Sequence, residues 1–275
     1  MTSAAVPSVN LLGVGISAVN PKTALCEIGR WIAQGERSYV CVTGVHGIME
    51  SHRDARIKAY HNGAGMVIPD GMPMVWWLRL AGHAEADRVC GPEFMPYLLD
   101  ASQQPGWTHF LYGATDETLA LLRAKILEEF PQVRIVGSYA PPFRPLTAAE
   151  DEDVIRRINA SGADIVWVGL STPKQERWMA EHSAALNAAA LIGVGAAFDM
   201  QAGLIARAPK FIRRTGFEWA YRLVLEPRRL WRRYMRNNPA FLVLALAQLC
   251  RIARFPLEGS ARTAAHKVPE GVSGH

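Results

Sequence analysis

The sequence predicts an α/β protein built of Rossmann-like parallel sheets in two halves, with a helical C-terminal appendage. Short apolar runs rich in β-branched residues alternate with longer segments of helical pattern, as in buried parallel strands joined by right-handed crossover helices. Most of these short runs end at a glycine or a turn pair. From Arg207 to Arg254 the strand pattern stops, and arginines alternate with aromatic residues instead.

These patterns divide the 275 residues into four parts. A seam near Gly106 separates a first α/β half, residues 1–105, from a second half, residues 106–206. Residues 207–255 form the basic amphipathic appendage, and residues 256–275 are predicted to be a disordered tail. With 49% hydrophobic residues, the chain can bury a sizeable core.

The first half is predicted to alternate three strands with helices. Thr43-Gly44 ends the second strand and Asp70-Gly71 ends the third, while Asn62-Gly63 is a turn pair that ends a helix. In chain order, the predicted elements are a strand over Val9–Val19 interrupted by Gly13 and Gly15, a helix over Pro21–Gln34, a strand over Tyr39–Thr43, a helix over Ser51–Asn62, a strand over Met66–Pro69, a helix over Met74–Ala81, and a turn over Arg88–Glu93 leading into a helix that ends near Ala101.

The second half is predicted to hold four strands. Gly113, Gly169 and Gly195 follow three of them, and the stiff turn Ala140–Phe143 follows the remaining one. The predicted strands cover His109–Tyr112, Val133–Tyr139, Asp164–Val168 and Ala190–Val194, and the predicted helices cover Glu117–Phe130, Ala148–Asn159 and Pro173 to about Leu186.

The stretch after the strand Ile165–Val168 is a candidate anion site. Gly169 ends the strand, Ser171 or Thr172 can cap a helix, and Pro173 suits its first turn. Free N–H groups at such a helix start favour phosphate. The alternative is an ordinary turn with a solvated first helical turn. Polar side chains at this mouth are those of Lys174, Gln175, Glu176 and Arg177.

Asp70 is a second candidate, because it follows an apolar strand directly. The carboxyl ends of parallel strands form the ligand crevice of open α/β sheets, where Asp70 would act as a general base. The alternative is a turn aspartate, since Asp-Gly is a common turn pair. Gly193-Val194-Gly195 resembles part of a dinucleotide fingerprint, but Phe198 stands at the third glycine position, which argues against a nicotinamide enzyme.

No metal or other cofactor is expected. The four cysteines are scattered and lack the spacing of a zinc site, which fits a reduced cytosolic protein. Asp151 and Asp153 form a DxD pattern, but they stand in the first turn of a predicted helix, where acids suit the dipole. The N-terminus shows no signal peptide, and no apolar run is long enough to span a bilayer.

The positive charge of the chain is concentrated in one segment. Ten Lys and Arg against two Glu lie between Arg207 and Arg236, a local net charge of +8, whereas the whole chain carries +5. Phe241 to Leu249 follows as a nearly continuous apolar run. Arginines beside large aromatics and an apolar helix favour an anionic membrane surface over nucleic acid. The alternative is a helical pair that packs on the core with a solvated arginine face.

Several separated motifs together resemble the WecG/TagA/CpsF glycosyltransferase family (glycosyltransferase family 26). Their order along roughly residues 10 to 242 carries the resemblance. The matching stretches are Val42-Thr43, Ile68–Gly71, Arg88–Gly91, Leu111–Gly113, Gly137–Phe143, Val168–Leu170, Pro173–Trp178, Gly193–Gly195, Phe198-Asp199, Arg207–Pro209, Glu218-Trp219, Glu226-Pro227 and Arg232–Tyr234.

The resemblance implies an inverting, metal-independent transferase that moves a hexose from a UDP-sugar to a polyprenyl-diphosphate-linked sugar, with the nucleotide-sugar site in residues 106–206. The enzyme would lie peripherally on the cytoplasmic face of the cell membrane and build a surface polysaccharide.

The resemblance also implies roles for single residues. Asp70 would be the base, Thr43 would hold a sugar, Arg88 and Gln175 would steady the leaving diphosphate, and Asp199 would contact the nucleotide base. The residues expected to clamp the lipid diphosphate are Arg222, Arg229 and Arg232.

The donor sugar is predicted from one position at which this sequence differs from the family pattern. Family members that transfer N-acetylmannosamine-type sugars carry an asparagine two positions after the threonine, where this chain has Val45. The variant resembles exopolysaccharide-type members linked to glucosyl transfer, which predicts UDP-glucose as donor and a sugar contact for His46. The alternatives are an N-acetylmannosamine or uronate donor, and a non-enzymatic basic protein that binds membrane or nucleic acid.

Overall fold

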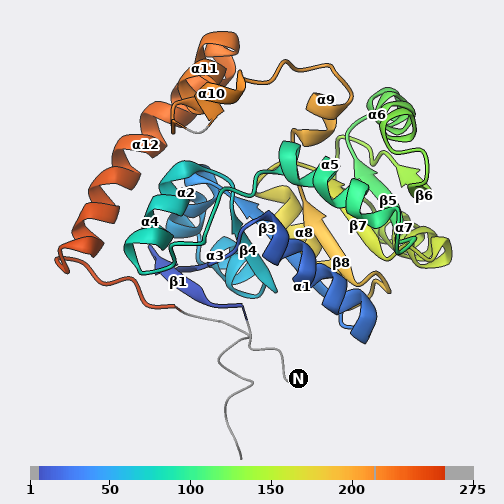
Figure 1. Ribbon diagram of the computed structural model, residues 1–275, viewed down its shortest axis with the longest axis horizontal. Coiled ribbons are helices and arrows are strands. Elements are labelled where there is room, and N and C mark those ends of the chain that lie inside the picture. Colours follow the sequence, from blue (N-terminus) through green and yellow to red (C-terminus); the bar gives the residue numbers. More distant parts are fainter. Residues whose placement is uncertain (1–5, 214, 258–275) are drawn as a thin grey trace, which may run out of the picture.

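A six-stranded parallel sheet forms the centre of the molecule, with strand order β4-β3-β8-β7-β5-β6 (Figure 1). The structure is a computed structural model that describes residues 6–213 and 215–257. Of the predicted disordered tail, residues 258–275 lie outside the described residues. The strands of the sheet are β3 (Ser38–Thr43), β4 (Met66–Pro69), β5 (Thr108–Gly113), β6 (Arg134–Tyr139), β7 (Ile165–Gly169) and β8 (Ala190–Gly193).

Both predicted halves contribute to this one sheet. β3 and β4 come from the first half, and β8 pairs in parallel with β3, with Ser38 opposite Ala190 and Cys41 opposite Gly193. The α/β class with parallel strands and C-terminal helices is therefore confirmed, with the two halves joined edge to edge. The proposed boundary near residue 105 stays a prediction.

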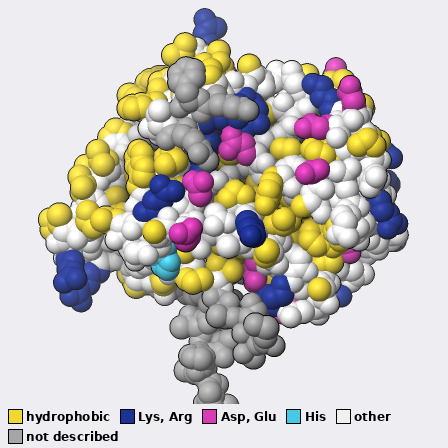
Figure 2. Space-filling view, in the orientation of Figure 1, with side chains coloured by type: hydrophobic (Ala, Val, Ile, Leu, Met, Phe, Trp, Pro, Cys, Tyr) yellow, Lys and Arg dark blue, Asp and Glu magenta, His cyan; other side chains and the backbone are white. Residues whose placement is uncertain are grey.

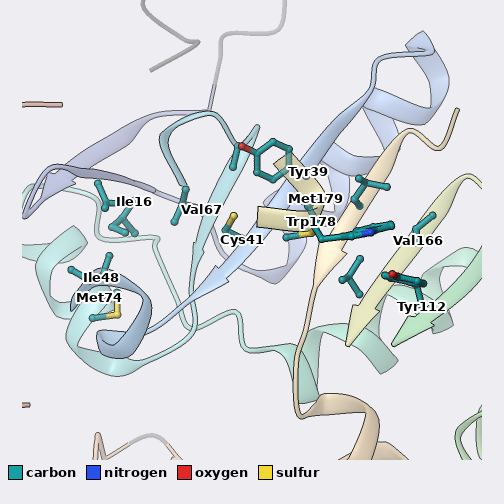
Figure 3. Close-up of a cluster of buried hydrophobic side chains, with 14 of the residues drawn as sticks. Ile16, Tyr39, Cys41, Ile48, Val67, Met74, Tyr112, Val166, Trp178 and Met179 are labelled. Atoms are coloured by element: carbon teal, nitrogen blue, oxygen red, sulfur yellow. The ribbon is translucent and has the colours of Figure 1, made fainter. Parts of the chain in front are cut away.

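Helices cover both faces of the sheet, and the strands other than the edge strand β6 are mostly buried. One buried cluster lies between the sheet and α1, α5, α6 and α9. The other includes α2, α4, α7, α8 and the second half of α12; Figure 3 shows Trp178 of α8 beside Tyr112 of β5, and the two rings are stacked. The helices are α1 (Pro21–Gln34), α2 (Val45–Arg53), α3 (Ala55–Asn62), α4 (Met72–Leu80), α5 (Gly91–Ser102), α6 (Asp116–Glu129), α7 (Ala148–Ser161), α8 (Lys174–His182), α9 (Ala197–Gln201), α10 (Lys210–Arg213), α11 (Glu218–Leu225) and α12 (Pro227–Leu249).

The N-terminal segment differs from its prediction as one strand. It is an antiparallel hairpin of β1 (Ser8–Leu11) and β2 (Val14–Ser17), with Leu11 opposite Val14. Leu12 and Gly13 both have positive φ, 52° and 87°, so they make the two-residue turn that the twist of a hairpin favours.

Two predicted helices have different bounds for local reasons. The single helix expected over Ser51–Asn62 is divided at Asp54, whose carboxylate accepts the Arg56 N–H at 2.8 Å and caps α3. Neither Ser171 nor Thr172 caps α8. The Thr172 hydroxyl donates to the Glu176 carboxylate at 2.8 Å instead. α8 ends at His182 rather than near Leu186.

The appendage formed by α10, α11 and α12 returns to the first half of the chain. α12 packs along α2, burying Phe241 and Ala245. At its end, Gln248 accepts the Leu12 N–H at 2.8 Å and donates to the Asn10 carbonyl at 3.0 Å. In the described part of the chain, no helix has the length and apolar character needed to cross a membrane.

Candidate active site

A cavity of about 710 Å³ lies at the carboxyl edge of the sheet. Its floor comes from the ends of strands, including Gly44 after β3, Asp70 after β4 and Gly195 after β8. α11 and α12 cover it from the other side and contribute arginines and aromatic residues. The volume and the mixed lining suit a ligand of nucleotide-sugar size.

Asp70 occupies the position after β4 that the sequence predicted. Its backbone N–H donates to the Thr43 carbonyl at 3.0 Å, which fixes the strand end. The carboxylate lies against Gly44, where an added Cβ would stand 3.5 Å from Oδ2, and it forms no hydrogen bond with any residue the structure describes. Burial raises the pKa of Asp70 to about 6, although the positive charge of Arg88 opposes the increase. A carboxylate with this pKa can accept a proton near neutral pH.

Arg88 joins this strand end to the appendage. Its Nε donates to the Asp70 carbonyl at 2.8 Å, and its Nη2 donates to the Glu218 carboxylate of α11. Its Nη1 lies 3.4 Å from the Arg213 carbonyl. The Arg88 side chain is only 10% exposed, so the guanidinium is a largely buried cation at the cavity wall.

Glu93 extends this network, and the sequence did not identify its role. Its carboxylate accepts from Arg213 at 2.9 Å and from Arg207 at 3.1 Å. Burial alone would raise the pKa of Glu93, but the Arg213 hydrogen bond and the Arg88 charge hold it below its ordinary value. Glu218 was also missed as a partner of Arg88. The available signal was that Glu218 is one of only two acids in the basic segment.

Gln175 and Glu176 lie beneath the cavity at the start of α8. The fully buried Glu176 carboxylate accepts from the Thr172 hydroxyl at 2.8 Å and from the Gln175 amide at 3.2 Å. One N–H of the Gln175 amide is used in this bond, and its Oε1, beside Gly195, is buried without a hydrogen-bond partner among the described residues. Gln175 lines the cavity, whereas Glu176 and the buried Thr43 are not among its lining residues.

Of the three predicted arginines of the appendage, two line the cavity and one does not. Arg222 of α11 and Arg229 of α12 line the cavity, and so does Arg233, which the sequence did not single out as a site residue. Arg232 lies outside the lining, with its guanidinium 5.4 Å from the Trp231 ring centre.

Three further predicted residues lie outside the cavity lining. Lys174 is at the first position of α8, and Gly169 packs against Phe198 so closely that a Cβ would meet the ring at 2.6 Å. Asp199, on α9, has its pKa raised by burial. His46, in contrast, lines the cavity from α2.

The predicted DxD residues are both engaged by neighbouring side chains. Asp151 accepts from His182 Nε2 at 2.9 Å, and Asp153 pairs with Arg156 and Arg157. Within residues 6–213 and 215–257, no three or more His, Cys, Asp or Glu side chains are grouped so as to hold a metal ion.

Comparison with known proteins adds the family to this geometry. The model of the glycosyl transferase WecG/TagA/CpsF family matches residues 9–254. The chain belongs to the WecG/TagA/CpsF glycosyltransferase family. The match covers the whole six-stranded sheet and the appendage through α12, so the resemblance drawn from the motifs is confirmed. Membership of this family favours a transferase over a non-enzymatic binding protein.

One curated relative gives this family membership a chemical context. The chain is 29% identical over 216 residues to the N-acetylglucosaminyldiphosphoundecaprenol N-acetyl-beta-D-mannosaminyltransferase of Bacillus spizizenii (strain ATCC 23059 / NRRL B-14472 / W23). The match covers 78% of this chain and 81% of the relative. The activity named for that relative corresponds to the N-acetylmannosamine alternative rather than to the glucose prediction.

Proposed function

We propose that this glycosyltransferase moves N-acetylmannosamine, or its uronate, from UDP to a polyprenyl-diphosphate-linked sugar such as N-acetylglucosaminyl-diphospho-undecaprenol. The observation that carries the proposal is the Asp70 carboxylate, which has a raised pKa and lies beside the Arg88 guanidinium in a cavity of nucleotide-sugar size. The named activity of the Bacillus spizizenii relative supports the choice of sugars.

The proposed reaction is a single inverting displacement. Asp70 removes the proton from the acceptor hydroxyl, whose oxygen attacks the anomeric carbon of the donor sugar as the bond to UDP breaks. Arg88 and Arg222 supply positive charge at the same cavity wall, where they would stabilise the diphosphate as it leaves. In the structure the Glu218 carboxylate is bound to the Arg88 guanidinium. The donor diphosphate would replace this carboxylate as the anion next to Arg88.

The remaining residue roles are adjusted to the geometry. Gln175 lines the cavity and keeps a second amide N–H, so its proposed role is still to steady the leaving diphosphate. Thr43 supports Asp70 through its backbone carbonyl. Arg229 of α12, which lines the cavity, would bind the lipid diphosphate. The roles expected of Asp199 and Arg232 stay predictions.

UDP-glucose is a second candidate donor because of Val45. This side chain lines the cavity at the first position of α2 and lacks the amide that an acetamido group would bind. Transfer assays with UDP-glucose, UDP-N-acetylmannosamine and its uronate, on one short-chain lipid acceptor, discriminate the donors. Turnover of the N-acetylmannosamine donor supports the first proposal, and turnover of UDP-glucose alone replaces it with the second.

Val45→Asn is expected to shift donor preference toward the acetamido sugar. The new amide adds one hydrogen bond, so the ratio of kcat/KM for UDP-N-acetylmannosamine to that for UDP-glucose should rise roughly tenfold. Val45→Leu is the matched control, because it changes size without adding an amide, and should leave the ratio near its wild-type value. An unchanged ratio in Val45→Asn contradicts a donor-selecting role for this position.

The proposed location is peripheral, on the cytoplasmic face of the membrane that holds the lipid acceptor. Figure 2 shows hydrophobic side chains gathered over the α11 and α12 side of the molecule, with arginines among them. Several line an apolar end of the cavity, which would take the first part of the polyprenyl chain. Exposed apolar residues on these two helices are Val224, Leu225, Trp231, Met235, Leu242, Val243, Leu246 and Leu249.

Replacing Val224, Met235 and Val243 with serine is expected to weaken binding to anionic vesicles at least tenfold. These side chains are 79%, 53% and 65% exposed, so the change removes apolar contact with the membrane and no core packing. Sedimentation with phosphatidylglycerol vesicles measures the effect. A matched control replaces the exposed Leu121 and Leu127 of α6 with serine. Equal binding by both variants and the wild type would contradict membrane contact through α11 and α12.

A further inference from the structure

His46 and Asn237 form a direct hydrogen bond between the core and the appendage. The Asn237 Nδ2 of α12 lies 3.1 Å from the Nδ1 of His46, which stands in the first turn of α2. Asn237 is only 3% exposed, and both residues line the cavity. The two side chains come from positions 191 residues apart, so the sequence pattern did not connect them.

The chemistry of this bond determines where the proton of the imidazole lies. In the orientation that the structure gives the Asn237 amide, its nitrogen faces His46 Nδ1 and donates to it, so Nδ1 accepts and the neutral ring carries its proton on Nε2. Burial lowers the pKa of His46 to about 4, helped by the charge of Arg233, so the ring is neutral at pH 7. We propose that Asn237 is a positioning residue that holds His46 in the Nε2–H tautomer, and that this N–H donates to an oxygen of a sugar substrate.

The groups around His46 favour Asn237 as the residue that fixes the tautomer. Glu50 of α2 lies 3.8 Å from His46 Nδ1, beyond hydrogen-bond distance, and accepts from Arg53 at 3.2 Å. Arg53 on α2 and Arg233 on α12 both disfavour a charged imidazole. Asn237 is therefore the group that directly contacts Nδ1.

The other ring nitrogen is available to a ligand. Within the described residues, His46 Nε2 makes no hydrogen bond, and it is not one of the buried nitrogens without a partner, as His61 Nε2 and His109 Nε2 are. A neutral N–H at the cavity matches the hydroxyl, ring or acetamido oxygens of a sugar. His46 would thus donate a hydrogen bond to a sugar in the same cavity in which Asp70 would accept a proton. These two roles rest on the proposed function.

Nitrogen NMR of the full-length protein labelled at histidine tests the tautomer without any transfer assay. His46→Gln identifies the His46 signals by their loss. The wild type should show the Nε2–H tautomer at pH 7. Asn237→Asp places a carboxylate at Nδ1, which should draw a second proton and raise the pKa of His46 by about one to three units. Asn238→Asp is the matched control, because it adds the same charge one residue further along α12 and should leave the tautomer unchanged.

Two NMR results would overturn the positioning role. One is a wild-type His46 that carries its proton on Nδ1. The other is an Asn237→Asp variant whose His46 titration matches that of the wild type. Because these spectra need no substrate, they test the role of Asn237 even if the proposed sugar transfer is wrong.

Steady-state kinetics test the sugar contact. His46→Phe should raise KM for one sugar substrate about tenfold or more, and His46→Gln, which keeps an N–H donor, should recover part of this loss. A rise confined to the UDP-sugar places the contact on the donor, and a rise confined to the lipid-linked sugar places it on the acceptor. Unchanged KM values for both substrates in His46→Phe would overturn the contact.

Discussion

Asp70→Asn is expected to fold normally and to lose sugar transfer by about 10²- to 10⁴-fold in kcat, the usual contribution of one positioned base. The substitution keeps the shape of the side chain and the backbone bond to Thr43, while it removes the group that accepts the acceptor proton. Thermal unfolding and single-turnover transfer measure the two properties separately. Asp153→Asn, in the exposed ion pairs of α7, is the matched control and should retain wild-type turnover. Turnover near the wild-type value in Asp70→Asn would refute the base role.

The pH dependence of the wild type provides a second readout of the same group. Burial raises the pKa of Asp70 to about 6, and a base must be ionised to accept a proton. Transfer should therefore be constant above this pKa and fall about tenfold for each pH unit below it. The residual rate of Asp70→Asn should lack this limb. A wild-type profile that stays flat to pH 5 would contradict the role of Asp70.

Arg88→Ala is expected to cause the second largest loss, about 10²- to 10³-fold in kcat/KM for the UDP-sugar, because a buried charge-assisted donor to the diphosphate disappears. The same change removes the partner of Glu218, so α11 should exchange its amide hydrogens faster. Steady-state kinetics and hydrogen exchange measure the two effects.

Glu218→Gln separates the two roles of Arg88. It weakens the contact that anchors α11 but leaves the guanidinium available to the diphosphate. We expect faster exchange in α11 with no loss of UDP affinity. If Glu218→Gln and Arg88→Ala reduce UDP affinity equally, Arg88 acts through the appendage and not through the diphosphate.

The parallel sheet was predictable because its strands are short apolar runs that end in turn residues. Pattern alone did not reveal the hairpin at Leu12-Gly13, since leucine seldom adopts the positive φ that this turn requires. The sequence pattern also missed the break between α2 and α3 at Asp54. An aspartate within a helical pattern can be an ordinary helix residue or the N-cap of a new helix, and the pattern alone does not distinguish the two.

The location of a residue in the cavity was predictable where that residue follows a strand directly, as with Asp70, or where a motif contained it, as with Arg88. It was not predictable where contacts join distant segments. Glu218 meets Arg88 across 130 residues, and no local period encodes that meeting. The same limit applies to the contact between His46 and Asn237, and to the different surroundings of Arg229 and Arg232.

The most direct test of the central claim is mass spectrometry of the lipid product, after purified full-length protein acts on UDP-N-acetylmannosamine and a short-chain polyprenyl-diphosphate N-acetylglucosamine. We predict one added N-acetylhexosamine per lipid, and none with Asp70→Asn. An unmodified lipid acceptor with every UDP-sugar, from protein that is folded and bound to vesicles, would contradict the claim that this cavity transfers a sugar to a lipid-linked acceptor.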